Sequence, residues 1–243
     1  MAVTTDGQAA RASLAAGLVL LAAAWTGQAL PAPAAAVKPT QELALLLRGQ
    51  AALAKPDPRA KPVRFVHARR PITYRPTVLP VIGHSTGPQG AAWLRVRLPG
   101  RPNGSTGWIR RYSTADTTTS WHIVVATSSR RVTVYRQGRV VRVFAAVVGK
   151  PSTPTPLGRF FVEEAVQLRA GDVGAPFALA LSARSNVLQE FAGGPGQIAV
   201  HGLANIGGRL GTAVSHGCVR LDNDAMRWLV VRIGPGVPVT ITG

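Results

Sequence analysis

Two stretches decide the fold of this chain: Val200-His201-Gly202 and Ser215-His216-Gly217-Cys218-Val219-Arg220-Leu221, separated by the Gly-rich segment 203–214. Cys218 is the only cysteine, so it forms no disulfide within the chain. A lone cysteine is most often a small buried apolar residue. Cys218 instead lies in a polar segment, directly after Gly217. The Gly-rich loop 203–214 separates this segment from the strand expected to end before His201. That setting indicates a reactive thiol.

Two histidines are candidates for the base that such a thiol requires. A thiol attacks as its thiolate, and histidine has a pKa suited to removing the proton near neutrality. His201 can approach from a neighbouring strand, whereas His216 shares a face with Cys218 if that segment is extended. Gly217 permits a sharp turn that aims successive N–H groups at one point, as an oxyanion site requires. Zinc accepts His201, His216 and Cys218 as ligands, but the pattern offers neither a fourth ligand nor a CxxC pair.

These motifs resemble the catalytic domain of the L,D-transpeptidases, the YkuD family. The resemblance extends over about residues 121–243, whereas the upstream half resembles only loosely the extra modules of actinobacterial members. It implies a mainly β fold, a sandwich or barrel-like catalytic domain with one or two short helices. It is supported by four further segments: Tyr135–Gly138, Gly149-Lys150, Thr155-Pro156-Leu157-Gly158 and Gly236–Ile241.

The resemblance also implies a mechanism that needs no metal and no cofactor. Cys218 would attack the carbonyl between the third stem residue of peptidoglycan and D-Ala, and His201 would accept the thiol proton. The main-chain carbonyl of Gly202 would orient His201, and the N–H groups of Gly217 and Cys218 would hold the oxyanion. An amine of a second stem would then release the acyl group and form a 3→3 cross-link, a step of cell wall biogenesis that bears on cell shape.

The resemblance gives the remaining motif residues supporting roles. Ser215 and His216 would shape the loop, and Arg220 and Ser215 are the candidates for binding the substrate. Two alternatives stay open: release to water, which makes the protein an L,D-carboxypeptidase, and a non-catalytic, basic wall-binding protein. The first differs only in the acceptor, and the second is disfavoured by the intact pair of Cys218 and His201.

The N-terminus has the pattern of an export signal over residues 1–36. Residues 14–25 are an apolar run that is short for a membrane span, and small residues suited to cleavage follow at 32–36. We expect the mature chain to begin between Ala35 and Lys38 and to keep no membrane span. An uncleaved anchor is the alternative, because Arg11 is the only basic residue before the run. The predicted location is therefore the cell wall or extracellular envelope.

The formal net charge of +18 would draw the protein toward polyanions such as an anionic cell wall. The basic residues are scattered, without the aromatic interleaving of single-strand binders, so nucleic acid is not an expected partner.

Composition divides the rest of the chain into three parts. Residues 37–62 are expected to form a Pro- and Ala-rich linker with a short helix, Gln41 to Ala54, ahead of a stiff stretch, Lys55 to Pro62. Residues 63–116 show short strands cut by turns and predict a small SH3-like β module, in which His67 and His84 are ordinary loop or surface residues.

Residues 120–243 predict a mainly β catalytic domain that folds by itself. Gln137-Gly138 is a hairpin turn between two strands, residues 163–176 are loop-like, and the convincing helix begins at Asp222 or Asn223 and stops by Gly234. The remaining expected strands are 122–126, 131–135, 140–148, 157–162, 177–182, 197–200 and 237–242.

Overall fold

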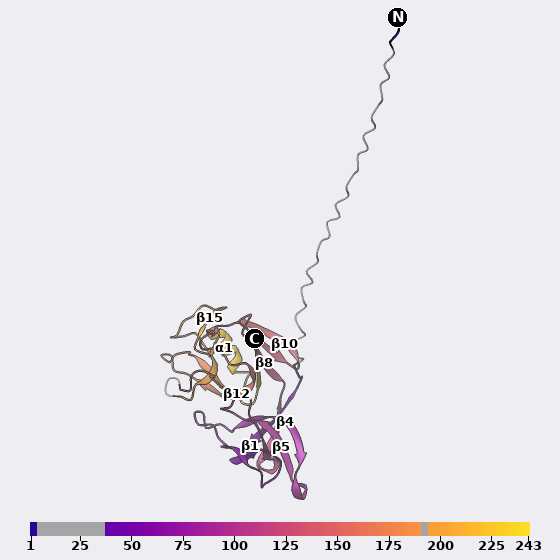
Figure 1. Ribbon diagram of the computed structural model, residues 1–243. Coiled ribbons are helices and arrows are strands. Elements are labelled where there is room, and N and C mark those ends of the chain that lie inside the picture. The colour runs from indigo at the N-terminus through magenta and orange to yellow at the C-terminus, as the bar shows by residue number, and fades with distance from the viewer. Residues whose placement is uncertain (4–36, 191–193) are drawn as a thin grey trace. The chain divides into compact units, whose positions relative to one another are not determined.

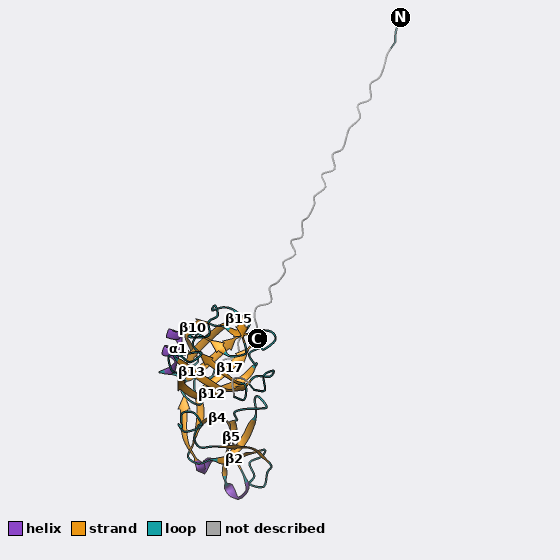
Figure 2. Ribbon diagram, turned by 90° about the vertical axis from the view of Figure 1, so that its left-hand side faces the viewer, coloured by secondary structure: helices purple, strands orange, loops and turns teal. Residues whose placement is uncertain are grey.

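Strands are the main regular structure of the described residues, and α1 (Asn223–Val230) is the one α-helix among them (Figure 2). The computed structural model describes residues 1–3, 37–190 and 194–243, and Ala36–Gly243 form one compact unit. The expected export signal lies outside the described residues. Within the described ranges, no helix has both the length and the apolar character that crossing a membrane would require.

The first sheet contains seven strands in the order β3-β2-β6-β5-β4-β1-β7. Their bounds are β1 Gln41–Leu46, β2 Gln50–Leu53, β3 Pro62–Val66, β4 Val78–Thr86, β5 Ala92–Arg97, β6 Thr106–Arg110 and β7 Thr114–Thr119. The strands β1, β4 and β5 lie side by side (Figure 1). The buried face of the sheet is built mainly from leucine, valine and isoleucine side chains of β1, β4, β5 and β6. Its likeness to an SH3 barrel stays a prediction.

Two expectations for residues 37–62 are wrong. The segment Gln41–Leu46 is rich in good helix formers, but it is strand β1, because β4 pairs along one edge of it and β7 along the other. These two neighbours take up its backbone hydrogen bonds, and tertiary pairing overrides local propensity. The expected stiff linker, 55–62, is the connection between the paired strands β2 and β3. The β module therefore begins near residue 41.

The second sheet contains eight strands in the order β10-β9-β8-β17-β12-β13-β14-β16, and a separate parallel pair joins β11 to β15. Their bounds are β8 Trp121–Ala126, β9 Arg131–Arg136, β10 Arg139–Ala145, β11 Val148–Gly149, β12 Gly158–Gln167, β13 Phe177–Arg184, β14 Gln197–His201, β15 Ala213–Ser215, β16 Val219–Arg220 and β17 Pro238–Thr242. Most of the expected strands are present, and the mainly β fold class is confirmed.

The hairpin turn and the helix cap expected for this part of the chain are present, but one expected loop is shorter. The turn between β9 and β10 has positive φ at both Gln137 and Gly138, the conformation of a type I′ hairpin. Asp222 caps α1 by accepting a hydrogen bond from the Asp224 N–H, 2.8 Å away. The expected loop 163–176 begins late, because β12 continues to Gln167 and pairs with β13 over that length.

The two sheets share apolar contacts. Phe161 of β12 is 1% exposed and packs into the buried cluster of the first sheet, beside residues of β1 and β4. A Cβ at Gly236 would lie 2.7 Å from Val78 Cγ1, so the chain before β17 packs closely against β4. The β module is thus part of the packing that supports the second sheet.

Candidate active site

His201 ends β14, and Cys218 directly precedes the neighbouring strand β16, at the edge of the second sheet. β14 and β16 are parallel, with Val200 opposite Val219 and His201 opposite Arg220. Because side chains alternate along a strand, the paired residues His201 and Arg220 lie on one face. Cys218 lies directly before β16, and the charge of Arg220 acts on both its thiol and the imidazole of His201.

His201 is held in the orientation that a base requires. Its Nδ1 lies 2.8 Å from the carbonyl oxygen of Gly202, so Nδ1–H donates and Nε2 is left as the acceptor. Burial lowers the pKa of His201, as does the charge of Arg220 more weakly, while the hydrogen bond to Gly202 opposes both. The imidazole is therefore neutral at pH 7 and able to accept a proton.

Two glycines fit closely around this histidine. A Cβ at Gly174 would lie 2.4 Å from His201 Nδ1, and a Cβ at Gly202 would lie 2.0 Å from the carbonyl oxygen of Ala175. Gly202 N–H also donates to the Gly174 carbonyl at 2.8 Å. Gly174 has φ +85°, so a side chain there would be strained as well as blocked. The sequence analysis missed Gly174, whose only signal is its place in the turn-rich run Gly171–Pro176.

Ser215 holds the turn that presents the nucleophile. Its side chain is fully buried, and its Oγ donates to the Cys218 carbonyl at 2.6 Å and accepts from Gly217 N–H at 3.1 Å. Gly217 has φ +119°, which a glycine adopts without strain. The Ser215 hydroxyl makes both of these hydrogen bonds inside the turn, and its expected role in binding substrate stays a prediction. The N–H of Gly217 already donates to Ser215 Oγ, and its expected role at the oxyanion also stays a prediction.

The Thr-Pro segment upstream supports this turn. The backbone N–H of Lys150 donates to the Ser215 carbonyl at 2.9 Å, and Thr153 Oγ1 donates to the same oxygen at 3.3 Å. Thr155 Oγ1 accepts from Gly149 N–H at 2.9 Å, and a Cβ at Gly149 would collide with this loop. The residues Gly149 and Thr155 therefore shape the platform on which the Cys218 turn rests.

The thiol of Cys218 is half-buried and points along β14. Its Sγ lies 4.0 Å from the carbonyl oxygen of Gln197. Burial raises the pKa of Cys218, while a backbone hydrogen bond with Ala199 and the charge of Arg220 pull in the other direction. The resting sulfur is thus a protonated thiol, and it needs a base before it can react.

Arg220 is a buried cation beside both reacting groups. It is 7% exposed, and its Nη1 donates to the Gly207 carbonyl at 3.2 Å. Its Nε–H has no hydrogen-bond partner within the described residues. A buried donor of this kind is costly unless something pairs with it, so Arg220 remains the candidate for holding a carbonyl or carboxylate of the substrate.

The second histidine has a different position. His216 is exposed on the turn, whereas His201 is buried behind it, so the two rings have different surroundings. The parts of the chain that the structure describes contain no group of three or more His, Cys, Asp or Glu residues able to hold a metal ion.

A clamp from the β module holds the connection that leads into β14, a feature that the sequence analysis missed. Arg101 donates to the carbonyl oxygens of Ser185, Leu188 and Pro195 at 2.8–2.9 Å. Asn103 exchanges hydrogen bonds with the backbone of Arg184, at 2.7 and 2.8 Å. No motif signals this clamp, because its donors and acceptors lie more than 80 positions apart in sequence.

Comparison with known proteins identifies the family. Residues 120–241 match the model of the L,D-transpeptidase catalytic domain, YkuD. L,D-transpeptidase 1 of Mycobacterium tuberculosis is 31% identical over 132 residues, 49% of each chain. The putative L,D-transpeptidase YkuD of Bacillus subtilis is 30% identical over 124 residues, 51% of this chain and 67% of that protein. The chain thus spans about half the length of the mycobacterial relative that it matches.

Among solved structures, an L,D-transpeptidase from Mycobacterium tuberculosis has a TM-score of 0.43 and 19% identity, over 81% of this chain and 77% of that one. The family match covers both motifs and all the strands of the second sheet. This chain belongs to the YkuD family of L,D-transpeptidase catalytic domains.

Proposed function

We propose that the protein is an L,D-transpeptidase that forms 3→3 cross-links in peptidoglycan. The observation that carries this proposal is the local geometry of His201: its Nδ1–H is fixed on Gly202, and it lies on β14, whose parallel neighbour β16 begins directly after Cys218. This arrangement gives a neutral base whose second ring nitrogen is left as the acceptor. No carboxylate is needed to orient the imidazole, because a carbonyl oxygen does so.

The reaction proceeds in two acyl transfers. Cys218 Sγ gives its proton to His201 Nε2 and attacks the carbonyl between the third stem residue and D-Ala, forming a tetrahedral oxyanion. Gly217 N–H is occupied by Ser215 Oγ, so the N–H of Cys218 is the donor proposed for that oxyanion. The C–N bond then breaks, His201 protonates the leaving D-Ala amine, and a thioester remains. An amine of a second stem attacks the thioester and regenerates the thiol.

Arg220 is proposed to bind the donor stem beside the scissile bond. Its guanidinium is buried, next to Cys218 and His201, and its Nε–H is unpaired in the described chain. A carbonyl or carboxylate of the stem would satisfy this donor. Ser215 and His216 are assigned to the turn instead.

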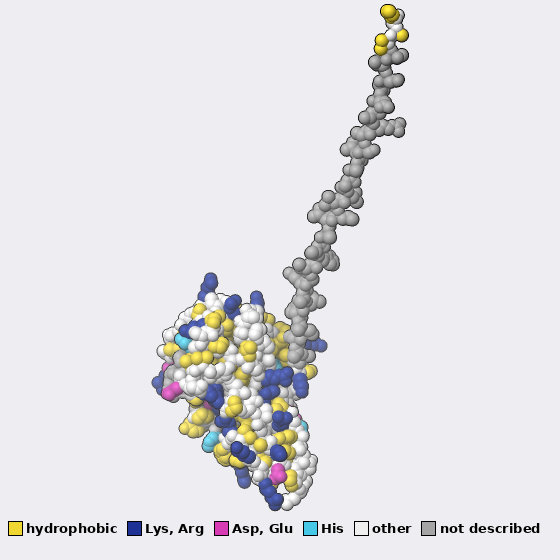
Figure 3. Space-filling model, in the orientation of Figure 1, with side chains coloured by type: hydrophobic (Ala, Val, Ile, Leu, Met, Phe, Trp, Pro, Cys, Tyr) yellow, Lys and Arg dark blue, Asp and Glu magenta, His cyan; other side chains and the backbone are white. Residues whose placement is uncertain are grey.

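The proposed location is the cell wall, after export directed by residues 1–36. Peptidoglycan lies outside the cytoplasmic membrane, so the proposed substrate requires export. Basic side chains are spread over the visible face and outnumber acidic ones there, as expected for a protein held near an anionic wall (Figure 3).

Product analysis tests the proposed reaction. The full chain is incubated with a disaccharide-tetrapeptide, and the products are separated and weighed by mass spectrometry. Cross-linked dimers that have lost one D-Ala support the proposal. Tripeptide alone would make the protein an L,D-carboxypeptidase, and unchanged substrate with retained wall binding would make it a binding protein.

A further inference from the structure

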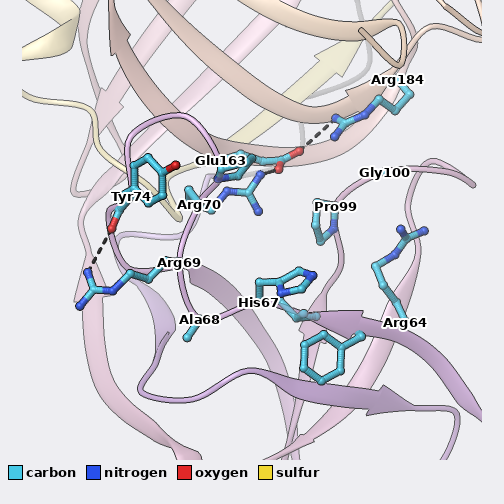
Figure 4. Close-up of a pocket in the computed structure, with 13 residues that line it drawn as sticks. Arg64, His67, Ala68, Arg69, Arg70, Tyr74, Pro99, Gly100, Glu163 and Arg184 are labelled. Atoms are coloured by element: carbon cyan, nitrogen blue, oxygen red, sulfur yellow. Dashed lines mark hydrogen bonds and ion pairs between the residues drawn. The ribbon is translucent and has the colours of Figure 1, made fainter.

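A second cavity lies away from the Cys218 turn, between β3 with its following loop and the strands β12 and β13 (Figure 4). Its volume is about 590 Å³. Four arginines line it, namely Arg64, Arg69, Arg70 and Arg184, together with the aromatic rings of Phe65 and Tyr74. Neither Cys218 nor His201 is among its lining residues. Nothing in the proposed reaction uses it.

The positive charge in this cavity exceeds the negative charge. Glu163 forms ion pairs with both Arg70 and Arg184 and is the acidic residue of the lining. Arg64 donates to the carbonyl of Arg101, and Arg69 donates to the carbonyl of Tyr74 at 3.0 Å (Figure 4). Neither has a carboxylate partner in the described ranges. Since each guanidinium has five N–H donors, most of theirs are available to an anion.

Tyr74 is held at the cavity in a strained conformation. Its φ is +54°, a region that bulky residues seldom adopt, and it is 73% exposed. The loop is fixed by Arg70 N–H, which donates to the Arg75 carbonyl at 2.9 Å, and by Thr73, whose N–H and Oγ1 both donate to Glu164 at 2.8 Å. The Tyr74 N–H also donates to the Arg70 carbonyl at 3.1 Å, so a closed turn holds the exposed ring at the cavity.

Phe65 offers a second exposed ring beside the arginines. It is 56% exposed, and the His67 ring stands on edge against it, with centroids 5.0 Å apart. Aromatic faces pack against the apolar faces of sugar rings, and arginines pair with carboxylates through two parallel hydrogen bonds. The cavity therefore combines the two kinds of contact that an acidic glycopeptide offers.

We propose that this cavity binds a carboxylate-bearing glycopeptide of the wall, with Arg64 and Arg69 on the carboxylates and Phe65 and Tyr74 on the sugar. The inference rests on the proposed function, which supplies that polymer. Gln197 connects the cavity lining to the region of the thiol: its Nε2 donates to Glu163 Oε1 at 3.2 Å, and its carbonyl oxygen lies 4.0 Å from Cys218 Sγ.

A disaccharide-dipeptide is the probe that separates this cavity from the active site. It has sugars and free carboxylates but lacks the bond that Cys218 would cleave, so binding to the wild-type full chain is measured by titration calorimetry without turnover. We expect Arg69→Gln and Phe65→Ala each to weaken binding about tenfold, the scale of one charge-assisted contact. Arg131→Gln removes one exposed charge elsewhere, on β9, and should leave binding unchanged.

Tyr74→Gly distinguishes a binding role from a structural one. Glycine accepts φ +54° without strain, but it also adds conformational freedom to the unfolded chain, and these two effects oppose each other. The variant should therefore melt close to the wild-type temperature and yet bind the probe about tenfold more weakly. If Tyr74 only supports the fold, the variant melts lower and binds as the wild type does, which overturns its assignment.

Three results would each contradict the proposed glycopeptide site. The inference is overturned if the carboxyl-amidated probe binds as tightly as the acid, if Arg131→Gln weakens binding as much as Arg69→Gln, or if polyphosphate binds this cavity more tightly than the probe. Acylation of Cys218 by a carbapenem should stay within about twofold in the cavity variants. Probe binding without any Cys218 acylation would refute the proposed function while leaving the binding site in place.

Discussion

At the scale of single residues, His201 and His216 have different surroundings. The ring of His201 is buried and fixed on Gly202, whereas His216 lies exposed on the turn. We expect a carbapenem to acylate Cys218 and Cys218→Ala to form no adduct, because the chain has no other thiol. His201→Ala should slow acylation at least about 100-fold, the scale of general base catalysis.

His216→Ala should slow acylation less than His201→Ala, through a misplaced turn. Intact-protein mass spectrometry over a time course measures all three variants. The assignment of the base is wrong if His216→Ala loses reactivity while His201→Ala retains it.

The pH dependence of acylation reports the state of His201. Burial lowers its pKa below 6.5, so the neutral base persists into mild acid and the rate should fall only below that pH. The positive charge of Arg220 contributes to lowering the pKa of both His201 and Cys218. Arg220→Gln should therefore raise both pKa values and move the acid limb to higher pH.

Acylation rates from pH 4.5 to 9, with Arg131→Gln as the charge-matched control, measure this shift. An acid limb that stays in place in Arg220→Gln would show that its charge does not act on the base.

At the scale of elements, the loop before β6 positions the connection from β13 to β14. Arg101→Ala removes three hydrogen bonds to that connection, so we expect slower acylation of Cys218, by about tenfold, at temperatures where the variant remains folded. Arg101→Lys should restore part of the rate, because an ammonium reaches fewer of the three carbonyls.

Arg95→Ala is the control for this prediction, since Arg95 is exposed on β5 and donates only to Thr106 Oγ1. Substrate-concentration dependence separates the two effects: a displaced β14 lowers the maximal acylation rate, whereas general destabilisation leaves the rate of the folded fraction unchanged. An unaltered maximal rate in Arg101→Ala contradicts a positioning role.

Some elements could be predicted from the sequence and others could not. The Gln137-Gly138 hairpin, the Asp222 cap and the strand before His201 depend on neighbouring residues, so local patterns predict them. β1 depends on two strands far along the chain, and its own composition favours a helix. The reactive pair was identified from the sequence because chemistry restricts those residue types. Gly174 and Arg101 act through shape and long-range hydrogen bonds, which leave no motif.

At the scale of the whole molecule, the β module is expected to be required for a working catalytic domain. Residues 120–243 alone would expose Phe161 and leave Glu163, which is 2% exposed, without its partner Arg70. We therefore expect this fragment, contrary to the expectation from sequence patterning, to be insoluble or to acylate far more slowly than the full chain.

Solubility, circular dichroism and carbapenem acylation of residues 120–243 measure this dependence. The full chain, purified in parallel, is the control. A soluble fragment that reacts at the rate of the full chain would show that residues 120–243 form an independent domain that begins near Ser120.

The resting position of the Cys218 sulfur has a consequence for its chemical durability. Peroxide and alkylating reagents attack the thiolate, and burial keeps this sulfur protonated against the backbone of β14. In an oxidising environment, a permanently ionised thiol would be converted to sulfenic and sulfinic acids. A thiol that stays protonated at rest escapes much of this damage. The low nucleophilicity of the resting sulfur therefore prolongs its working life.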